Sequence, residues 1–262
     1  MGFGVHVSKL TVKRYAFAVI ATAACGFAAL SAPASADGPG PLRELGATGP
    51  LGNEKLSDEF LVTRFGYPTR KYKVRRGPGR SYHTFARLRF YTEDQAPENY
   101  LVLSSQLGPN GAPWLKIRMP MRPNGTKGWV PARALRLRTL TTSFEIDKRA
   151  LKARLFKDGR EIWTSSVGIG APGTPTPSGR YWVRERLNNA GGNPAYGPFA
   201  FGTSAYSRLS DWPGGGVVGI HGTNAPSLIP GRPSHGCVRV PNWKIATLRE
   251  LMPVGTPIWI HD

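Results

Sequence analysis

The chain is poor in cysteine. Its 262 residues include only Cys25 and Cys237. Two cysteines this far apart exclude the disulfide frameworks of small secreted domains and the paired-cysteine knuckles of structural zinc sites. The fold therefore depends on its hydrophobic cores, and each cysteine needs an explanation of its own.

Acidic residues are also scarce. The sequence has 16 Asp and Glu against 35 Lys and Arg, a formal net charge of +19 at pH 7. So basic a chain favours anionic surroundings. Because the N-terminus predicts export, we expect no nucleic acid as a partner, and the available polyanions are anionic wall polymers or a membrane surface. The alternative, that the charge only keeps the protein soluble, stays open.

Long apolar runs are confined to the N-terminus. One run, from about Ala16 to Leu30, follows three basic residues and precedes Ala34-Ser35-Ala36, an A-x-A cleavage site. It falls short of the roughly 18 to 20 residues that a spanning helix needs. Residues 1–36 are therefore predicted to be a signal peptide, with the product exported to the periplasm or to the cell wall and outer face of the cytoplasmic membrane.

Cleavage after Ala36 would leave Cys237 as the sole cysteine, so no intrachain disulfide could form. A leftover cysteine in an exported protein is either inert in the core or a reactive thiol. A rival interpretation makes Cys25 the acylated N-terminus of a lipoprotein. Thr22, however, stands where a lipobox normally has an aliphatic residue.

The rest of the chain is predicted to be mainly β. Residues 37–67 begin with Gly and Pro and show no sustained period, which indicates a linker. Short alternating runs then follow, separated by turn residues. In the second half, Asp158-Gly159 predicts a hairpin turn. One helical pattern covers Trp243 to Met252, with Asn242 as its N-cap, so we expect one or two short helices.

The runs within residues 68–138 resemble a bacterial SH3-like domain. The resemblance is carried by Val74-Arg75-Arg76-Gly77-Pro78-Gly79, by Trp114-Leu115-Lys116-Ile117 and by Gly128-Trp129-Val130. It implies a small β-barrel of a kind that often binds wall peptides or glycan. Trp114 and Trp129 could stack on such a ligand, but in so small a barrel we expect them to fill the core.

The motif with the most chemistry is Ser234-His235-Gly236-Cys237-Val238-Arg239. A strand ending at His221 and a second strand beginning near Cys237 would hold an imidazole beside a thiol. A free thiol, with a pKa of about 8.5, is mostly protonated at neutral pH and needs an imidazole, a positive field or backbone N–H groups to activate it. We therefore expect Cys237 to be a nucleophile held deprotonated.

Residues 139–262 resemble the L,D-transpeptidase catalytic domain of the YkuD family. The resemblance is carried by HGTNAPSLIPGRPSHGCVRV, with TPTPSG upstream and GTPIWI at the end. It implies a β-sandwich or barrel and a cysteine enzyme without metal or other cofactor. The implied substrate is the peptidoglycan stem peptide, and covalent acylation by carbapenems is expected.

The resemblance assigns roles by position. Cys237 is the nucleophile and His221 its base, while the main-chain N–H groups of His235, Gly236 and Cys237 face the oxyanion. Ser234 and Gly222 support this loop. His235 stays an alternative base, because it would share a strand face with Cys237 if the segment were extended.

Other residues of this region have weaker assignments. Either a backbone carbonyl near Gly222 or the Ser234 hydroxyl is expected to orient the His221 ring, and Asp211 is expected to form a turn rather than a catalytic triad. Arg239, and less so Arg232, could bind a substrate carboxylate. Three aromatic residues of the expected substrate flap, Tyr196, Phe199 and Tyr206, have no assignable role.

The implied reaction is acyl transfer. The thiolate attacks the carbonyl of the third stem residue, D-alanine leaves, and the thioester passes to a diamino-acid amine or to water. Two alternatives stay open: a metal site of His221, His235, Cys237 and His261, and a wall-binding protein with a silent catalytic domain. The sequence does not identify the diamino acid or the balance between cross-linking and hydrolysis.

Overall fold

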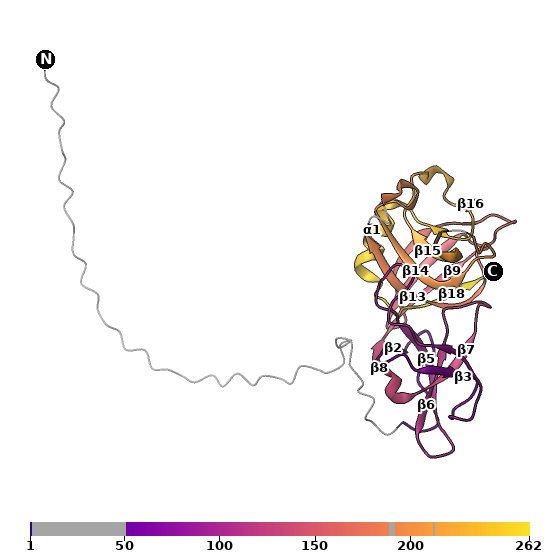
Figure 1. The fold of residues 1–262 in the computed structure, drawn as a ribbon. Helices are drawn as coiled ribbons and strands as arrows, with labels where there is room; N and C mark the ends of the chain where they lie inside the picture. The colour runs from indigo at the N-terminus through magenta and orange to yellow at the C-terminus, as the bar shows by residue number, and fades with distance from the viewer. Residues whose placement is uncertain (2–50, 189–191, 212) are drawn as a thin grey trace. The chain divides into compact units, whose positions relative to one another are not determined.

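The structure is a computed structural model that describes every residue except 2–50, 189–191 and 212 (Figure 1). The predicted signal peptide and the first part of the predicted linker lie outside the described residues. None of the helices in the described part of the chain is long and apolar enough to cross a membrane.

The described residues before Thr142 form one eight-stranded sheet, of order β4-β3-β7-β6-β5-β2-β8 with β1 paired to β5. Its elements are β1 (Glu54–Lys55), β2 (Thr63–Pro68), β3 (Lys73–Arg75), β4 (Thr84–Arg87), β5 (Tyr100–Leu107), β6 (Pro113–Arg118), β7 (Lys127–Pro131), the 3-10 turn η1 (Ala132–Ala134) and β8 (Leu135–Leu140).

The first sheet encloses its own core. Alternate residues of its strands point inward and are fully buried, among them Val74, Val102, Leu115, Ile117 and Val130. Trp114 is also buried, and Trp129 is half-buried with the Lys116 ammonium 5.7 Å from its ring centroid.

The expected linker was wrong for its last residues. Thr63–Pro68 forms β2, which pairs with both β5 and β8. The sequence of β2 shows no clear alternation of apolar and polar residues, because its buried positions hold Phe65, the polar Thr63 and Gly66, which has no side chain. A Cβ at Gly66 would be tightly packed, since it would lie 3.0 Å from the Arg136 carbonyl oxygen.

From Thr142 the chain builds a ten-stranded sheet of order β11-β10-β9-β18-β13-β14-β15-β17-β12-β16. Its strands are β9 (Thr142–Asp147), β10 (Lys152–Lys157), β11 (Arg160–Ser166), β12 (Gly168–Gly170), β13 (Gly179–Asn188), β14 (Phe199–Tyr206), β15 (Val217–His221), β16 (Gly231–Ser234), β17 (Val238–Arg239) and β18 (Pro257–His261). The 3-10 turns are η3 (Pro194–Tyr196), η4 (Pro213–Gly216) and η5 (Pro226–Leu228). The prediction of a mainly β chain is confirmed.

The predicted hairpin turn is present between β10 and β11. Asp158 and Gly159 both have positive φ, 51° and 74°. This conformation matches the twist of two adjacent strands, and Asp and Gly adopt it readily.

One α-helix, α1 (Asn242–Leu251), occurs in the described part of the chain. It packs on the second core through Ile245 and Leu248, with Met252 just beyond its end. Trp243, counted in the predicted apolar pattern, is instead 68% exposed. The N-cap prediction was also wrong, because Pro241 occupies that position and makes no side-chain cap.

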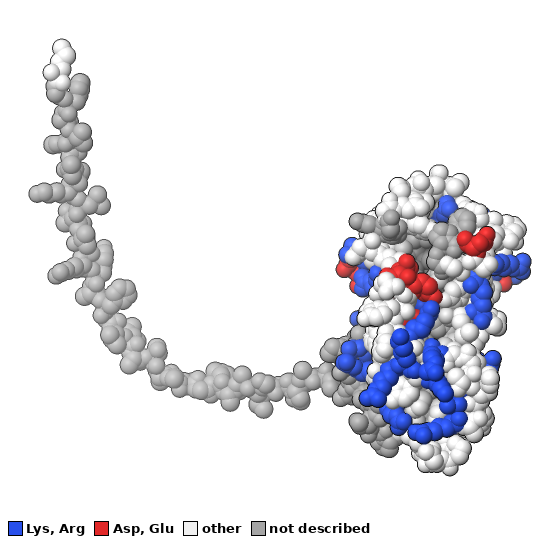
Figure 2. All heavy atoms as spheres, in the orientation of Figure 1, with Lys and Arg blue, Asp and Glu red and all other residues white. Residues whose placement is uncertain are grey.

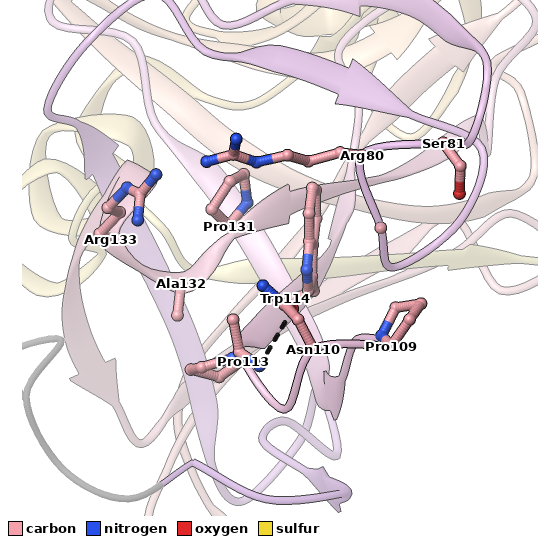
Figure 3. Close-up of a pocket in the computed structure, with 11 residues that line it drawn as sticks. Arg80, Ser81, Pro109, Asn110, Pro113, Trp114, Pro131, Ala132 and Arg133 are labelled. Carbon is pink, nitrogen blue, oxygen red and sulfur yellow. Dashed lines mark hydrogen bonds between the residues drawn. The ribbon is translucent and has the colours of Figure 1, made fainter.

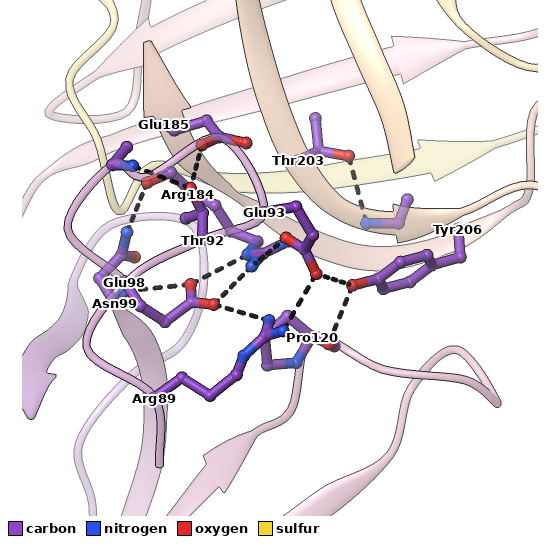
Figure 4. Close-up of polar contacts among 12 residues, drawn as sticks. Arg89, Thr92, Glu93, Glu98, Asn99, Pro120, Arg184, Glu185, Thr203 and Tyr206 are labelled. Atoms are coloured by element: carbon purple, nitrogen blue, oxygen red, sulfur yellow. Dashed lines mark hydrogen bonds and ion pairs between the residues drawn. The ribbon is translucent and has the colours of Figure 1, made fainter. Parts of the chain in front are cut away.

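Buried charges join the two sheets (Figure 4). Arg184 of β13 is inaccessible to solvent and forms ion pairs with Glu98 and Glu93 from the segment between β4 and β5. The Tyr206 hydroxyl lies 3.2 Å from the Glu93 carboxylate. Buried charges are stable only when paired in this way, so the network fixes β13 and β14 against the first sheet.

Candidate active site

The strand register places Cys237 and His221 on one face of the second sheet. β15 and β17 are parallel neighbours, with Ile220 opposite Val238 and His221 opposite Arg239. Ile220 and Val238 point into the core. Because successive side chains of a strand alternate between faces, His221, Arg239 and Cys237 face the other way.

Gly219 keeps a space open between thiol and imidazole. Its N–H donates to the Cys237 Sγ at 3.3 Å. A Cβ built on Gly219 would lie 3.8 Å from that Sγ and 3.6 Å from Cδ2 of His221. The sulfur and the Cδ2 side of the ring therefore border the same small space.

The His221 ring is oriented by a main-chain carbonyl. Nδ1 lies 2.6 Å from the Gly222 oxygen, which can only accept, so Nδ1 carries the hydrogen. Nε2 is then left with a lone pair for a proton. Tyr196 packs edge-on against the ring, with centroids 4.8 Å apart. Of the two orienting groups expected, the Gly222 carbonyl makes this contact.

Asn242 holds the segment that carries this carbonyl. Its Oδ1 accepts a hydrogen bond from the Thr223 N–H at 2.8 Å. A Cβ on Gly222 or Gly197 would lie 2.5 Å from the same oxygen, so both positions require glycine. Sequence reasoning placed Asn242 as a helix cap and missed this role, since its partner lies 19 residues away.

Burial sets the charge state of the pair. It lowers the pKa of His221 to about 4, with a further lowering by the Arg239 guanidinium. Burial raises the pKa of the Cys237 thiol, against smaller opposing effects of the Gly219 N–H and Arg239. Both shifts favour a neutral thiol beside a neutral imidazole in the resting site, whereas the sequence predicted a thiolate.

Ser234 organises the loop before the thiol. Its hydroxyl donates to the Cys237 carbonyl at 2.6 Å and accepts from the Gly236 N–H at 3.2 Å. The Gly236 amide thus has an acceptor inside the loop, and it can face an oxyanion only if this bond is given up. Gly236 has a φ of 125°, which favours glycine.

Thr176 is a second support that sequence reasoning missed. It is buried, donates to the Gly236 carbonyl at 2.8 Å and accepts from the Gly170 N–H at 2.9 Å. It belongs to the TPTPSG motif, so the signal was present, but its partner lies 60 residues later.

His235 is exposed, unlike His221. The positive φ of Gly236 interrupts the extended conformation that would have placed His235 on the face of Cys237. The structure therefore favours His221 as the base.

The remaining candidates lie as follows. Asp211 is exposed. Arg239 is half-buried, and its Nε makes no hydrogen bond within the described residues. Arg232 donates to the Lys148 carbonyl at 3.3 Å. Phe199 packs in the core against Phe201.

The residues of the alternative metal site do not all converge. His261 Nε2 lies 2.8 Å from the Glu145 carboxylate. Within the described part of the chain, no three His, Cys, Asp or Glu residues are grouped so as to hold a metal ion.

Residues 141–260 match the family model of the YkuD L,D-transpeptidase catalytic domain. The matched residues include both Cys237 and His221. This region is 33% identical over 107 residues to the L,D-transpeptidase YkuD of Bacillus licheniformis. This match covers 41% of the present chain and 58% of the Bacillus protein.

The same domain is 36% identical over 110 residues to the L,D-transpeptidase YbiS of Escherichia coli K12, covering 42% of this chain and 35% of that protein. The chain thus spans about half the length, or less, of the curated relatives it matches here. Among solved structures, the Ldtfm–avibactam carbamoyl enzyme is 26% identical with a TM-score of 0.38, over 46% of this chain and 49% of that chain.

Proposed function

We propose that the protein is an exported cysteine L,D-transpeptidase that acts on peptidoglycan stem peptides. The observation that carries the proposal is the space at Gly219, bordered by the Cys237 sulfur and the imidazole edge of His221. A carbonyl carbon placed there would be within reach of the nucleophile, and the base would be within reach of the thiol proton.

The neutral pair defines the order of events. Nε2 of His221 takes the thiol proton as Sγ attacks the carbonyl of the third stem residue. Because the imidazolium is strongly acidic with a pKa of about 4, it readily returns this proton to the departing D-alanine nitrogen. A thioester on Cys237 and free D-alanine result.

The second half-reaction regenerates the enzyme. An amine of a neighbouring stem, or water, attacks the thioester carbonyl and gives a proton to His221. The C–S bond breaks, and the sulfur leaves as a thiol by taking that proton. With an amine the product is a cross-link between two stems, and with water it is a trimmed stem.

D-Alanine release and dimer formation from a synthetic tetrapeptide test this proposal by mass spectrometry. Cys237→Ser, Cys237→Ala and His221→Gln should abolish both products, whereas His235→Gln should retain them. Undiminished release by Cys237→Ala would refute the assignment of the nucleophile. Export would be tested separately, through the N-terminal sequence of the protein recovered from the cell envelope, which should begin at Asp37.

A pocket in the first sheet favours a second function. We propose that residues 68–138 form an SH3-like domain and that this pocket binds an anionic wall polymer. The pocket has a volume of about 420 Å³. Figure 3 shows the Arg80 side chain extended over Pro131 toward Arg133, with Trp114 beside them. Apolar rings below two guanidinium groups suit a polymer with carboxylate or phosphate groups.

The charge around this pocket agrees with such a partner. The sequence has no Asp or Glu between Phe60 and Thr92, or between Asn99 and Phe144. Figure 2 shows Lys and Arg gathered over the first sheet on the face in view. Retention of the full-length Cys237→Ala protein on purified sacculi should fall in Arg80→Gln/Arg133→Gln but not in Arg160→Gln, and equal retention of all three would contradict wall binding by this pocket.

A further inference from the structure

A different cavity, of about 670 Å³, lies beside the loop that carries the thiol. It is lined by Arg122, Pro123, Asn124, Lys148, Pro175, Thr176, Pro177, Ser178, Tyr206, Ser207 and Arg208. Two of these meet Gly236: Thr176 through its hydrogen bond, and Ser207, whose Cβ would be 3.0 Å from a Cβ on Gly236. Two lining residues of the cavity therefore contact the residue that precedes Cys237.

Cations line this cavity. Arg122, Lys148 and Arg208 border it, and the described lining residues include no acid. Arg208 is exposed and forms neither an ion pair nor a hydrogen bond through its guanidinium with the residues that the structure describes. The Lys148 ammonium is less available, because it lies 3.0 Å from the Asp262 carboxylate.

Arg122 holds the segment after β14 through main-chain carbonyls, and these contacts include no acid. Its guanidinium donates to the carbonyls of Ser207, Leu209 and Gly215 at 3.0, 3.1 and 3.0 Å. It also lies over the Tyr206 ring at 4.7 Å. Neutral carbonyls and a ring do not cancel a positive charge, so Arg122 contributes to the field in the cavity.

One wall of the cavity comes from the first sheet. Arg122, Pro123 and Asn124 belong to the connection between β6 and β7. The Asn124 amide exchanges two hydrogen bonds with the Tyr206 main chain, at 2.8 and 3.0 Å. The family match begins only at residue 141, so this wall lies outside the catalytic domain.

We propose that this cavity is the subsite for the terminal carboxylate of the donor stem peptide, with Arg208 as its direct contact. The inference rests on the proposed function and adds a specificity determinant to it. The terminal carboxylate belongs to the leaving residue and therefore lies close to the bond that Cys237 attacks. A site for it should lie near Cys237, and Thr176 and Ser207 of this cavity contact the preceding residue, Gly236. A guanidinium fork pairs with a carboxylate through two parallel hydrogen bonds.

The test measures binding without turnover. Full-length Cys237→Ala is titrated calorimetrically with a synthetic tetrapeptide ending in a free carboxylate and with the same peptide as its terminal amide. We expect the acid to bind about tenfold more tightly than the amide, as for one charge-assisted contact. In the Arg208→Gln background most of this preference should be lost with the affinity for the amide unchanged, and Arg208→Lys should restore part of it.

Arg160→Gln, an exposed arginine of the β10–β11 hairpin, serves as the matched control and should keep the preference. An unchanged preference in Arg208→Gln, or equal affinity for acid and amide in the parent, would overturn the subsite. Its failure is distinguishable from failure of the proposed function. If the proposed function is wrong, the unmodified chain releases no D-alanine, whichever peptide it binds.

Discussion

The guanidinium of Arg184 and the carboxylate of Glu98 form an ion pair in which neither side chain is accessible to solvent. A second hydrogen bond joins Arg184 Nε to Glu98 at 2.9 Å. Asn99, the next residue, donates to the Arg184 carbonyl at 2.7 Å. The segment that leads into β5 is thus joined to β13 by an ion pair and by a side-chain hydrogen bond to the main chain.

Removing one partner of this pair should strongly destabilise the fold. We expect Glu98→Ala to lower the free energy of unfolding by about 3–5 kcal/mol, because the Arg184 charge would stay buried without its main partner. Urea denaturation measures the change. The matched control is Glu161→Ala, which breaks the part-exposed pair with Arg154 and should cost less than about 1 kcal/mol. Equal losses in both variants would contradict this account.

Asn242 should act on catalysis through the Gly222 carbonyl. Asn242→Ala removes the acceptor of the Thr223 N–H, so we expect kcat to fall about tenfold, the equivalent of one hydrogen bond of roughly 1.4 kcal/mol. Asn242→Asp keeps an acceptor oxygen and should restore most of the rate. The Asn242 side chain is exposed, so the melting temperature should change little. A parallel loss of stability and rate in Asn242→Ala would point to a structural role only.

Stability should depend on pH through His221. The pKa of this imidazole is about 4 in the folded state against 6.5 when unperturbed, so between these values the unfolded chain binds the extra proton. The neutral ring therefore contributes its full stability above about pH 6.5, and the contribution is lost as pH falls through 4. The loss is about 3 kcal/mol. The free energy of unfolding, measured by urea denaturation from pH 4 to 7, should depend less steeply on pH in His221→Gln than in the unmodified chain. An identical pH dependence would argue against a buried neutral His221.

A carbapenem should acylate the protein once. The same thiol and base that attack the stem carbonyl would open the β-lactam ring and leave a thioester on Cys237. Intact-protein mass spectrometry should show a single adduct, and peptide mapping should place it at residue 237. Cys237→Ala should show none, and His221→Gln should react much more slowly. An adduct on any other residue would count against the proposed nucleophile.

Much of the fold could be predicted because strand runs and turn residues are local signals. Asp158-Gly159 specifies its turn by backbone preference alone, and β15 follows from an uninterrupted apolar run that ends at His221. β2 escaped prediction because Thr63 and Gly66 occupy its buried positions. Trp243 was misjudged since its spacing fits the apolar face, whereas the helix places it in solvent.

The sequence indicated which residues to consider for the candidate site, but not their charge states or the residues that support them. The Cys237 motif is contiguous, so sequence alone indicates it. The neutral state of the thiol follows from burial, which depends on strands far apart in the chain. Thr176, Asn242 and Arg122 act on partners 60, 19 and 85 or more residues away, and nothing in their local sequence marks these contacts.

Gly219 contributes by what it lacks. A methyl group there would stand at ordinary van der Waals distance from both the sulfur and the imidazole, so the folded chain would accept alanine without strain. That methyl would nonetheless fill the volume in which a scissile carbonyl has to sit. We therefore expect Gly219→Ala to keep the fold and both reactive groups but to lose the proposed activity, because one added carbon atom would occupy the place of the substrate carbonyl.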